Sequence, residues 1–408
     1  MEYINTQQFP SERRTERRHT ALWIIIPVAW VLSLILVGSA VYLATRPLQI
    51  GNETLVNAIA NVRNCIRENY YFYEGDDQAL TDAALKGMAA GTGDDYAYYY
   101  TAQEYAELTK QNEGSFVGIG ILTMIEDDGA VRIVDVYENT PASEAGLAIG
   151  DQLTEINGVS YEGLDLSAFL SNVVAEDGAE NTIKVLREGQ ELTFKIVARE
   201  VHSPSVAYRM LNETIGYIRI STFHGTCVEE TETALSALRE QGMTALVLDL
   251  RDNLGGSLYD ALDIADFFLP KDHVITSLRS RSDAEQKFYT KTDGMDIPTV
   301  LLVNGYSASA SELVAGALKD YEAAYLIGTR TFGKGIVQSY FNIPQTNGML
   351  KITTEAYYTP NGVCVHGEGI EPDEVVELPE DAQRYSISVL PFELDTQLQA
   401  AIDYLETH

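Results

Sequence analysis

The spacing of apolar residues changes character twice after residue 50. Residues 51–112 contain two runs, LVNAIANVRNCIRENY and DQALTDAALKGMAA, whose apolar side chains lie three and four positions apart. This spacing gathers the apolar side chains on one face of a helix, so both runs are predicted to be helical. The stretch GDDYAYYYTAQEY that follows is dense in tyrosine, and we interpret it as a segment that packs against a neighbouring domain.

Residues 113–200 instead contain short runs in which apolar and polar side chains alternate. VRIVDVY, QLTEING, NTIKVLRE and ELTFKIVARE are of this kind, and turn dipeptides such as Asn157-Gly158 border them. Alternation of this type predicts strands that are buried on one face. The segment is therefore predicted to be a small β-rich domain, with one helix at LDLSAFLSNVV.

From residue 205 to residue 376, buried-strand candidates alternate with helix candidates. The strands are IGYIRIS, TALVLDL, TVLLVN and AAYLIGT, and the helices are CVEETETALSALREQ, LYDALDIADFFL and SELVAGALKDYEA. Strands that alternate with helices of this length predict βαβ units and a largely parallel sheet, which is an α/β fold. A last helix is predicted at LDTQLQAAIDYLETH.

The N-terminal part contains a long apolar run, ALWIIIPVAWVLSLILVGSAVYLA, preceded by a cluster of arginines at positions 13–18. The run is long enough to cross a hydrocarbon core of about 30 Å, and positive charge on its N-terminal flank favours a cytoplasmic N-terminus. We predict a single-pass anchor at residues 21–45 in the cell membrane, with the catalytic part outside the cytoplasm. The alternative is a cleavable signal peptide with Gly38 and Ala40 before the cut, but the run exceeds the usual signal core of about 7–15 residues.

Composition excludes several classes of function. The net charge of −32 argues against nucleic acid as a partner, because binding phosphates needs clustered Lys and Arg. The three cysteines lie far apart and form neither a disulfide framework nor a metal-binding spacing. Gly328 to Lys334 fits the start of a phosphate-binding loop, but Gly335 stands where that loop needs Ser or Thr. No cofactor and no metal are predicted.

Two loops are candidates for catalytic chemistry, because sites in α/β sheets form at the carboxyl ends of parallel strands. One follows TALVLDL and reads RDNLGGS, in which Arg251 and Asp252 are interpreted as a local ion pair. The other follows TVLLVN, reads GYSASASE and leads into a helix. A serine needs a base to remove its proton, and no histidine lies near either loop in sequence. A desolvated lysine can act instead, and Lys334 in TFGKG, with Phe332 as apolar cover, is the candidate.

Several motifs together resemble the signature of the carboxy-terminal processing peptidases, the tail-specific Ser/Lys proteases of family S41. They are SASASELVAGALKDY, GTRTFGKGIVQ, IGYIRISTF, VLDLRDNLGG and YYTPNGVCVHGEGIEPD. The resemblance implies that Ser309 is the nucleophile and Lys334 the general base. It also implies that Gln338 orients the lysine. Ser307 and Ser311 are interpreted as loop and helix-cap residues.

The same resemblance implies an oxyanion hole made of backbone N–H groups. One belongs to Ala310, and the other to a glycine of NLGG, Gly255 or Gly256. Family members usually have proline before this glycine pair, where the present chain has Leu254. That difference affects the rigidity of the loop but removes no catalytic atom.

The β-rich segment resembles a PDZ domain through TPASEAGLAIGDQLTEING and through the loop Gly118, Ile119, Gly120 and Ile121. Such a loop presents N–H groups to the terminal carboxylate of a bound peptide. The resemblance implies a ClpP/crotonase-like serine peptidase core with this domain inserted, and helical ends that mediate dimerisation in the family. The predicted organisation is a basic tail, an anchor, a helical region, a PDZ-like domain, a peptidase core and a C-terminal segment with a helix, at residues 1–20, 21–45, 46–112, 113–200, 201–376 and 377–408.

The predicted function is a serine endopeptidase that cleaves exported proteins near their C-termini, with the PDZ-like domain recognising or gating substrate tails. Its predicted partners are proteins with accessible C-terminal tails, the membrane through the N-terminal helix, a second copy of the chain and a regulatory protein. Two alternatives are a catalytically latent scaffold that binds tails and a different serine hydrolase. GxSxG, the pattern of many such hydrolases, fails at Ser309, since Ser307 and Ser311 flank it. We also expect Lys334 to be displaced from Ser309 in a resting enzyme.

Overall fold

A computed structural model describes residues 53–112, 114–125, 129–161 and 165–408 of the chain. The chain divides after Ala84 into two units, and the second comprises Leu85–His408. The predicted anchor at residues 21–45 lies outside the described residues. Within the described ranges, no helix is both long and apolar enough to cross a membrane.

The predicted N-terminal helices are confirmed as α2 (Glu53–Asn69) and α3 (Asp77–Ala90). Asp77, at the first turn of α3, joins the two helices, because its carboxylate accepts hydrogen bonds from Arg63 and Arg67 at 2.8 and 3.1 Å. The hydroxyl of Tyr73 donates to the same carboxylate at 2.7 Å. The tyrosine-rich stretch continues as a short strand, β1 (Tyr98–Tyr100), and a helix, α4 (Ala102–Asn112).

The β-rich segment forms a sheet in the order β3-β4-β5-β7-β8, with β6 paired to β5 and with β2 paired to β9 beside it. Val131, Ile133, Leu153, Ile183 and Val185 point inward from alternate positions of their strands and pack with Phe169 of the predicted helix. The alternation predicted for this segment is therefore confirmed. The elements are β2 (Ser115–Gly118), β3 (Ile121–Ile125), β4 (Val131–Val136), α5 (Pro141–Ala145), β5 (Gln152–Ile156), β6 (Val159–Ser160), α6 (Leu166–Leu170), β7 (Glu180–Arg187), β8 (Gln190–Val197) and β9 (Arg199–His202).

The predicted α/β segment contains a sheet in the order β10-β11-β12-β15-β16-β19, parallel from β11 to β19 and with β10 antiparallel at one edge. The predicted parallel sheet is therefore confirmed. The strands are β10 (Val206–Met210), β11 (Ile215–Ile220), β12 (Ala245–Asp249), β15 (Thr299–Val303), β16 (Tyr325–Gly328) and β19 (Glu374–Val375).

Apolar side chains cover both faces of this sheet, so its central strands are buried throughout. Ile218, Leu246 and Leu301 lie in one core with α7 (Cys227–Glu240), α8 (Leu258–Asp266) and α9 (Ala310–Asp320). Tyr217, Val247 and Leu302, one position away, lie in a second core with α10 (Thr396–Thr407). The two cores use alternate positions because successive side chains of a strand point to opposite faces. Three short 3-10 helices, η1 (Glu380–Arg384), η2 (Ile387–Val389) and η3 (Phe392–Leu394), precede α10.

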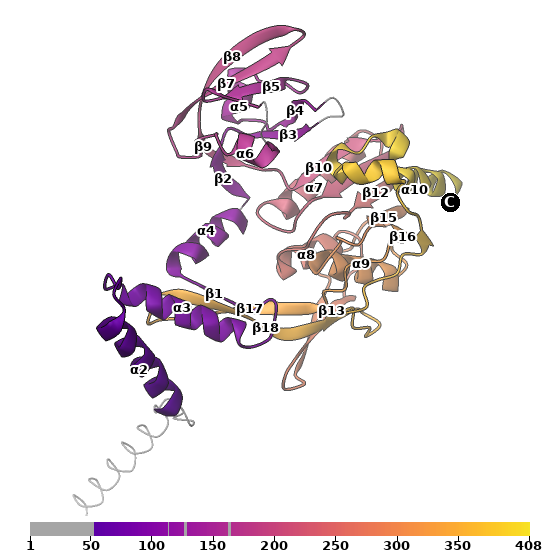
Figure 1. The fold of residues 1–408 in the computed structure, drawn as a ribbon. Helices are drawn as coiled ribbons and strands as arrows, with labels where there is room; N and C mark the ends of the chain where they lie inside the picture. The colour runs from indigo at the N-terminus through magenta and orange to yellow at the C-terminus, as the bar shows by residue number, and fades with distance from the viewer. Residues whose placement is uncertain (1–52, 113, 126–128, 162–164) are drawn as a thin grey trace, which may run out of the picture. The chain divides into compact units, whose positions relative to one another are not determined.

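A second, antiparallel sheet of the core was not predicted. Its order is β1-β18-β13-β14, and β17 pairs with the edge of β18 opposite to β1, since Tyr98 and Tyr340 both pair with Lys351 (Figure 1). Tyr98, Tyr99 and Tyr100 supply β1, since aromatic side chains suit a pleated surface. The other strands are β13 (Val274–Ser280), β14 (Glu285–Tyr289), β17 (Ile336–Ile343) and β18 (Gly348–Tyr358).

Candidate active site

The two loops singled out in the sequence follow β12 and β15, which are neighbouring parallel strands. They are tied together by hydrogen bonds to the backbone of Asn253, whose carbonyl accepts from the Ala308 N–H at 3.0 Å and from the Ser311 hydroxyl at 2.8 Å. The Ser307 hydroxyl donates to the Leu250 carbonyl at 2.8 Å. The buried side chains of Ser307 and Ser311 therefore link the two loops by hydrogen bonds.

Ser309 sits between these two serines in an unusual backbone conformation. Its φ is 56° and its ψ is −111°, at the residue immediately before α9. A non-glycine residue held in such a region costs about 1–3 kcal/mol and persists only where the surroundings fix it. Here the Ser309 carbonyl accepts from the Leu313 N–H at 3.0 Å and from the Tyr357 hydroxyl at 2.9 Å. These contacts offset the strain and fix the direction of the serine.

Glu312 holds the serine loop against the loop of Lys334. Its side chain is fully buried. One carboxylate oxygen accepts from the N–H groups of Ser309 and Lys334, at 2.9 and 2.8 Å. The other accepts from the Gly333 N–H at 2.7 Å and the Thr331 hydroxyl at 2.6 Å. One side chain thus sets the distance between the backbones that carry the predicted nucleophile and base.

The predicted oxyanion loop approaches Ser309 closely. Gly255 has a φ of +101°, and a Cβ added to it would lie 2.8 Å from Cβ of Ser309, so only glycine fits without a shift. Its N–H is already engaged, because it donates to the side-chain oxygen of Asn253 at 2.9 Å. An oxyanion therefore has to displace Asn253 to take this donor. Ala310 begins α9, where N–H groups have no acceptor within the helix.

Lys334 is half-buried, and its ammonium lies 4.4 Å from the centre of the Tyr96 ring. Burial lowers the pKa of Lys334 from the ordinary lysine value, and the nearby Lys351 lowers it further, whereas Asp94 and Glu312 act in the opposite direction. Although both residues are among those described, no hydrogen bond joins Nζ of Lys334 to Oγ of Ser309. The expected displacement of Lys334 from Ser309 in a resting enzyme stays a prediction.

Gln338 lies in β17, four residues after Lys334. Its side-chain amide donates to the Thr353 hydroxyl at 3.3 Å, across the β17–β18 pair. The bonds of the described residues include none between Gln338 and Lys334. The predicted orienting role of Gln338 therefore requires a movement of one of these side chains.

All the residues predicted for catalysis border one cleft of about 850 Å³. Its floor is formed by the two loops, and its walls come from α4, α8, β14, β17 and β18. Predicted catalytic residues on the cleft are Ser309, Ala310, Gly255, Gly256, Lys334 and Gln338. The structure thus brings together residues that are up to 83 positions apart (338 − 255).

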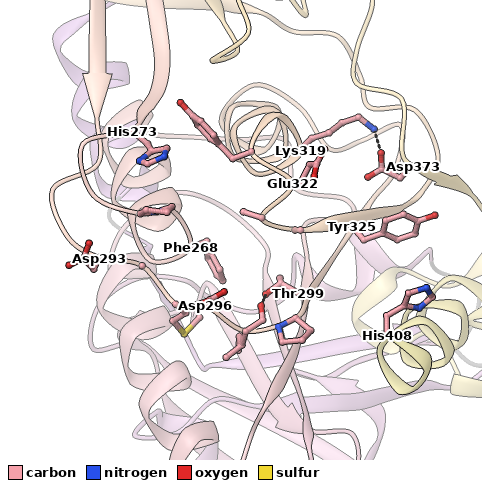
Figure 2. A pocket seen from close by; sticks show the side chains of 18 of the residues that line it. Phe268, His273, Asp293, Asp296, Thr299, Lys319, Glu322, Tyr325, Asp373 and His408 are labelled. Atoms are coloured by element: carbon pink, nitrogen blue, oxygen red, sulfur yellow. Dashed lines mark hydrogen bonds and ion pairs between the residues drawn. The ribbon is translucent and has the colours of Figure 1, made fainter.

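A second cavity, of about 1030 Å³, lies elsewhere in the core and is shown in Figure 2. Phe268, His273 and Tyr325 contribute to its wall, and Lys319 forms an ion pair there with Asp373. Of the described residues that line it, none belongs to the predicted catalytic set. Size alone therefore does not identify the candidate active site.

Arg251 and Asp252 both lie in the described part of the chain and form no ion pair with each other there, contrary to the prediction. Arg251 is fully buried and binds the carboxylates of Asp249 and Asp395 at 2.6 and 2.7 Å. Asp252 instead accepts a hydrogen bond from the Asn304 amide at 2.8 Å. Because Asp395 immediately precedes α10, its ion pair with Arg251 links the C-terminal helix to the start of the oxyanion loop.

The predicted tail-binding loop borders a groove of about 260 Å³ in the β-rich domain, together with side chains of β5, α6 and β7. The carbonyls of Ile119 and Gly120 accept hydrogen bonds from the N–H groups of Ala142 and Tyr137, at 2.9 and 3.0 Å. Gly120 has a φ of +86°, and a Cβ there would lie 2.4 Å from Cβ of Thr140. The loop is thus fixed from the side of α5.

Sequence reasoning missed Glu312, Asn253, Tyr357 and Tyr96. The Glu312 contact had a signal in the sequence, since a glutamate three residues after a serine at a helix start is the capping-box pattern. Asn253 lies within the RDNLGGS loop, but its contacts to Ala308 and Ser311 cross to the other loop. Tyr357 and Tyr96 contact the site from segments that are distant in sequence. Their roles depend on the tertiary fold.

The fold and the site define a class: an α/β peptidase core joined to a PDZ domain. The model of peptidase family S41 matches residues 214–376, and that of the PDZ domain matches residues 117–197. A probable CtpA-like serine protease of Staphylococcus aureus (strain COL) is 30% identical over 400 residues, which cover 96% of this chain and 79% of that protein. The chain belongs to this family of CtpA-like S41 serine proteases.

Solved structures resemble this fold. A putative S41 protease from Bacteroides fragilis NCTC 9343 aligns with a TM-score of 0.57 at 19% identity and covers 83% of this chain and 91% of its own. The photosystem II D1 C-terminal processing protease aligns with a TM-score of 0.49 at 24% identity and covers 80% of this chain and 88% of its own. The two family models and the Staphylococcus aureus relative confirm the prediction of an S41 peptidase with a PDZ domain.

Proposed function

We propose that the protein is a serine endopeptidase in which Ser309 is the nucleophile and Lys334 the general base. The observation that carries the proposal is the buried Glu312, which binds the backbone N–H groups of both residues through one oxygen. Holding two reacting groups at a fixed separation is a main source of catalytic rate. The strained backbone of Ser309 and the lowered pKa of Lys334 support the same roles.

In the proposed reaction, neutral Lys334 takes the proton of the Ser309 hydroxyl as its oxygen attacks a peptide carbonyl. The resulting oxyanion accepts hydrogen bonds from the N–H groups of Ala310 and Gly255, once the Gly255 N–H has released the side-chain oxygen of Asn253. Lys334 then gives the proton to the departing amine, and water releases the acyl group by the reverse path. Gln338 orients the lysine after it moves toward the serine.

The substrates we propose are exported proteins cleaved near their C-termini. The groove beside Gly118, Ile119, Gly120 and Ile121 supports tail recognition, because a peptide adds to a PDZ sheet edge while its carboxylate binds loop N–H groups. The predicted anchor at residues 21–45 would place the enzyme on the outer face of the cell membrane. A second copy of the chain and a regulatory protein remain predicted partners.

The test is to incubate the full-length protein in detergent with an unfolded protein that ends in an apolar tail. Ser309→Ala and Lys334→Ala variants run alongside, and mass spectrometry locates the cuts. We expect cleavage near the C-terminus by the parent and none by either variant. Equal cleavage by the parent and Lys334→Ala would overturn the assignment of the base. Tail binding without cleavage by the parent would favour the latent scaffold.

The tail-binding role needs its own test. A variant lacking residues 114–199 should lose its preference for substrates with a free apolar C-terminus, while one with Gly120→Val should lose it through disruption of the loop. Unchanged cleavage and unchanged preference in both variants would assign the PDZ domain a structural role.

A further inference from the structure

The tyrosine-rich segment packs on the antiparallel sheet beside the candidate active site. β1 pairs with β18, so that Tyr98 lies opposite Lys351 and Tyr99 opposite Leu350. The Tyr99 hydroxyl, fully buried, is bonded to the Thr346 hydroxyl at 2.6 Å. Tyr100 borders the same cleft as Ser309 and Lys334. The strand pairing therefore fixes the segment beside the predicted catalytic residues.

Asp94 anchors the start of this segment. One of its carboxylate oxygens accepts from the Thr353 N–H of β18 at 3.1 Å. The other accepts from the Tyr96 N–H at 2.9 Å. The backbone of Tyr96 is thus tied to β18, the strand that also carries Tyr357, the donor to the Ser309 carbonyl. Tyr96 has a defined position relative to both predicted catalytic groups.

The Tyr96 ring faces the amine of Lys334, with Nζ 4.4 Å from the ring centre. An aromatic face carries negative charge density, so it attracts an ammonium and not a neutral amine. The ring therefore favours the protonated lysine. Around the same amine, Asp94 of the preceding loop and Glu312 of α9 also favour the ammonium, whereas Lys351 of β18 and burial oppose it.

We propose that Tyr96 is a positioning residue, whose ring holds the Lys334 ammonium away from Ser309 in the resting enzyme and sets the pH at which the lysine becomes a base. The proposal rests on the proposed function, in which Lys334 is that base. When Lys334 turns toward Ser309 it leaves the ring, and the interaction that stabilised its proton is lost. Activation is then a movement between two positions of one side chain.

Substitutions at Tyr96 can test the effect of the aromatic ring separately from the effects of the hydroxyl and of side-chain size. Tyr96→Phe keeps the ring, whereas Tyr96→Leu keeps apolar cover without an aromatic face. Tyr96→Met, which is unbranched, serves as a second ring-free variant should the leucine variant fail to fold. Tyr98→Leu is the matched control, because Tyr98 is in the same segment but its ring faces Lys86 and not Lys334.

The first measurement is the pH dependence of kcat/KM for these variants. Without the ring, the ammonium is less stable and the acid limb should move to lower pH, by roughly 0.4–1.5 pH units from the usual strength of such contacts. The profiles of Tyr96→Phe and Tyr98→Leu should match the parent. Coincident profiles for the parent and both ring-free variants, or a change in rate without a shift in pH, would overturn the proposal.

The second measurement does not depend on activity. Brief acylation by acetic anhydride over a range of pH, followed by mass spectrometry, reports the protonation of Lys334 against other lysines of the same molecule. We expect Lys334 to be acylated at lower pH in the ring-free variants than in the parent. If cleavage does not depend on Lys334, the proposed function fails, while this titration still decides whether Tyr96 stabilises the ammonium.

Discussion

Glu312→Gln is the substitution that most sharply tests the geometry of the site. The side chain accepts four hydrogen bonds in a fully buried position, two on each oxygen. An amide replaces one oxygen by an NH2 group. In one orientation the N–H groups of Ser309 and Lys334 then face another donor, and in the other orientation the Gly333 N–H does, while the Thr331 hydroxyl can rotate to accept. Each unsatisfied donor costs about 1–3 kcal/mol, so one or two of them lower the free energy of unfolding by roughly 1–6 kcal/mol.

The effect on activity follows from which donors are lost. If the NH2 group faces Ser309 and Lys334, the contact that sets their separation becomes repulsive. If it faces Gly333 and Thr331, the Gly333 N–H loses its acceptor, and the Lys334 loop is held by one hydrogen bond fewer. A displacement of about 1 Å at a catalytic group can reduce the rate about 10²-fold, so kcat/KM should fall at least that much.

Chemical denaturation gives the change in stability, and peptide cleavage under conditions where the variant is folded gives kcat/KM. Glu240→Gln is the matched control, because Glu240 is exposed at the end of α7 and should change neither quantity. A Glu312→Gln enzyme with stability within about 0.5 kcal/mol of the parent and unchanged kcat/KM would refute the reasoning.

Three further predictions follow from other contacts. Asp395→Ala should lower the free energy of unfolding by about 3–5 kcal/mol in denaturant titration, because it removes one partner of the buried Arg251. A change below about 1 kcal/mol would contradict a stabilising role of the Arg251–Asp395 ion pair. Gly255→Ala should reduce kcat about 10²–10³-fold in steady-state assays, since its Cβ meets Ser309, whereas Gly87→Ala, with nothing within 4 Å, should not. The rate of cleavage should rise with pH and reach half its maximum below the usual lysine pKa of about 10.4, because burial lowers the pKa of Lys334 and only the neutral amine is a base. Lys334→Arg should be inactive at every pH. Retained activity in that variant would exclude the lysine as the base.

The parts of the fold that could be predicted are those in which local pattern and burial agree. Strands β11, β12 and β15 are mainly apolar runs that alternate with helices, and strands β4 and β7 alternate cleanly, so periodicity alone identifies them. The β17–β18 hairpin was missed. Most positions of both strands are partly buried, so no clear alternation or apolar run marks them.

The candidate site shows the same limit. Ser309, Lys334 and Gln338 could be named because their motifs resemble those of a family, and the structure gathers them on one cleft. The contacts that set their geometry join segments that are far apart. Tyr357 is 48 residues from Ser309, and the pairing of β1 with β18 brings in Tyr96 from across the PDZ domain. Such contacts depend on long-range strand pairing, which one sequence does not specify by local pattern.

The central claim is that Lys334 activates Ser309, and the most direct test is covalent. The full-length protein is treated with a fluorophosphonate that labels activated serines, and the adduct is located by mass spectrometry in the parent and in Lys334→Ala. We expect an adduct on Ser309 in the parent and little or none in the variant. An adduct on another serine, or equal labelling of Ser309 without the lysine, would contradict it.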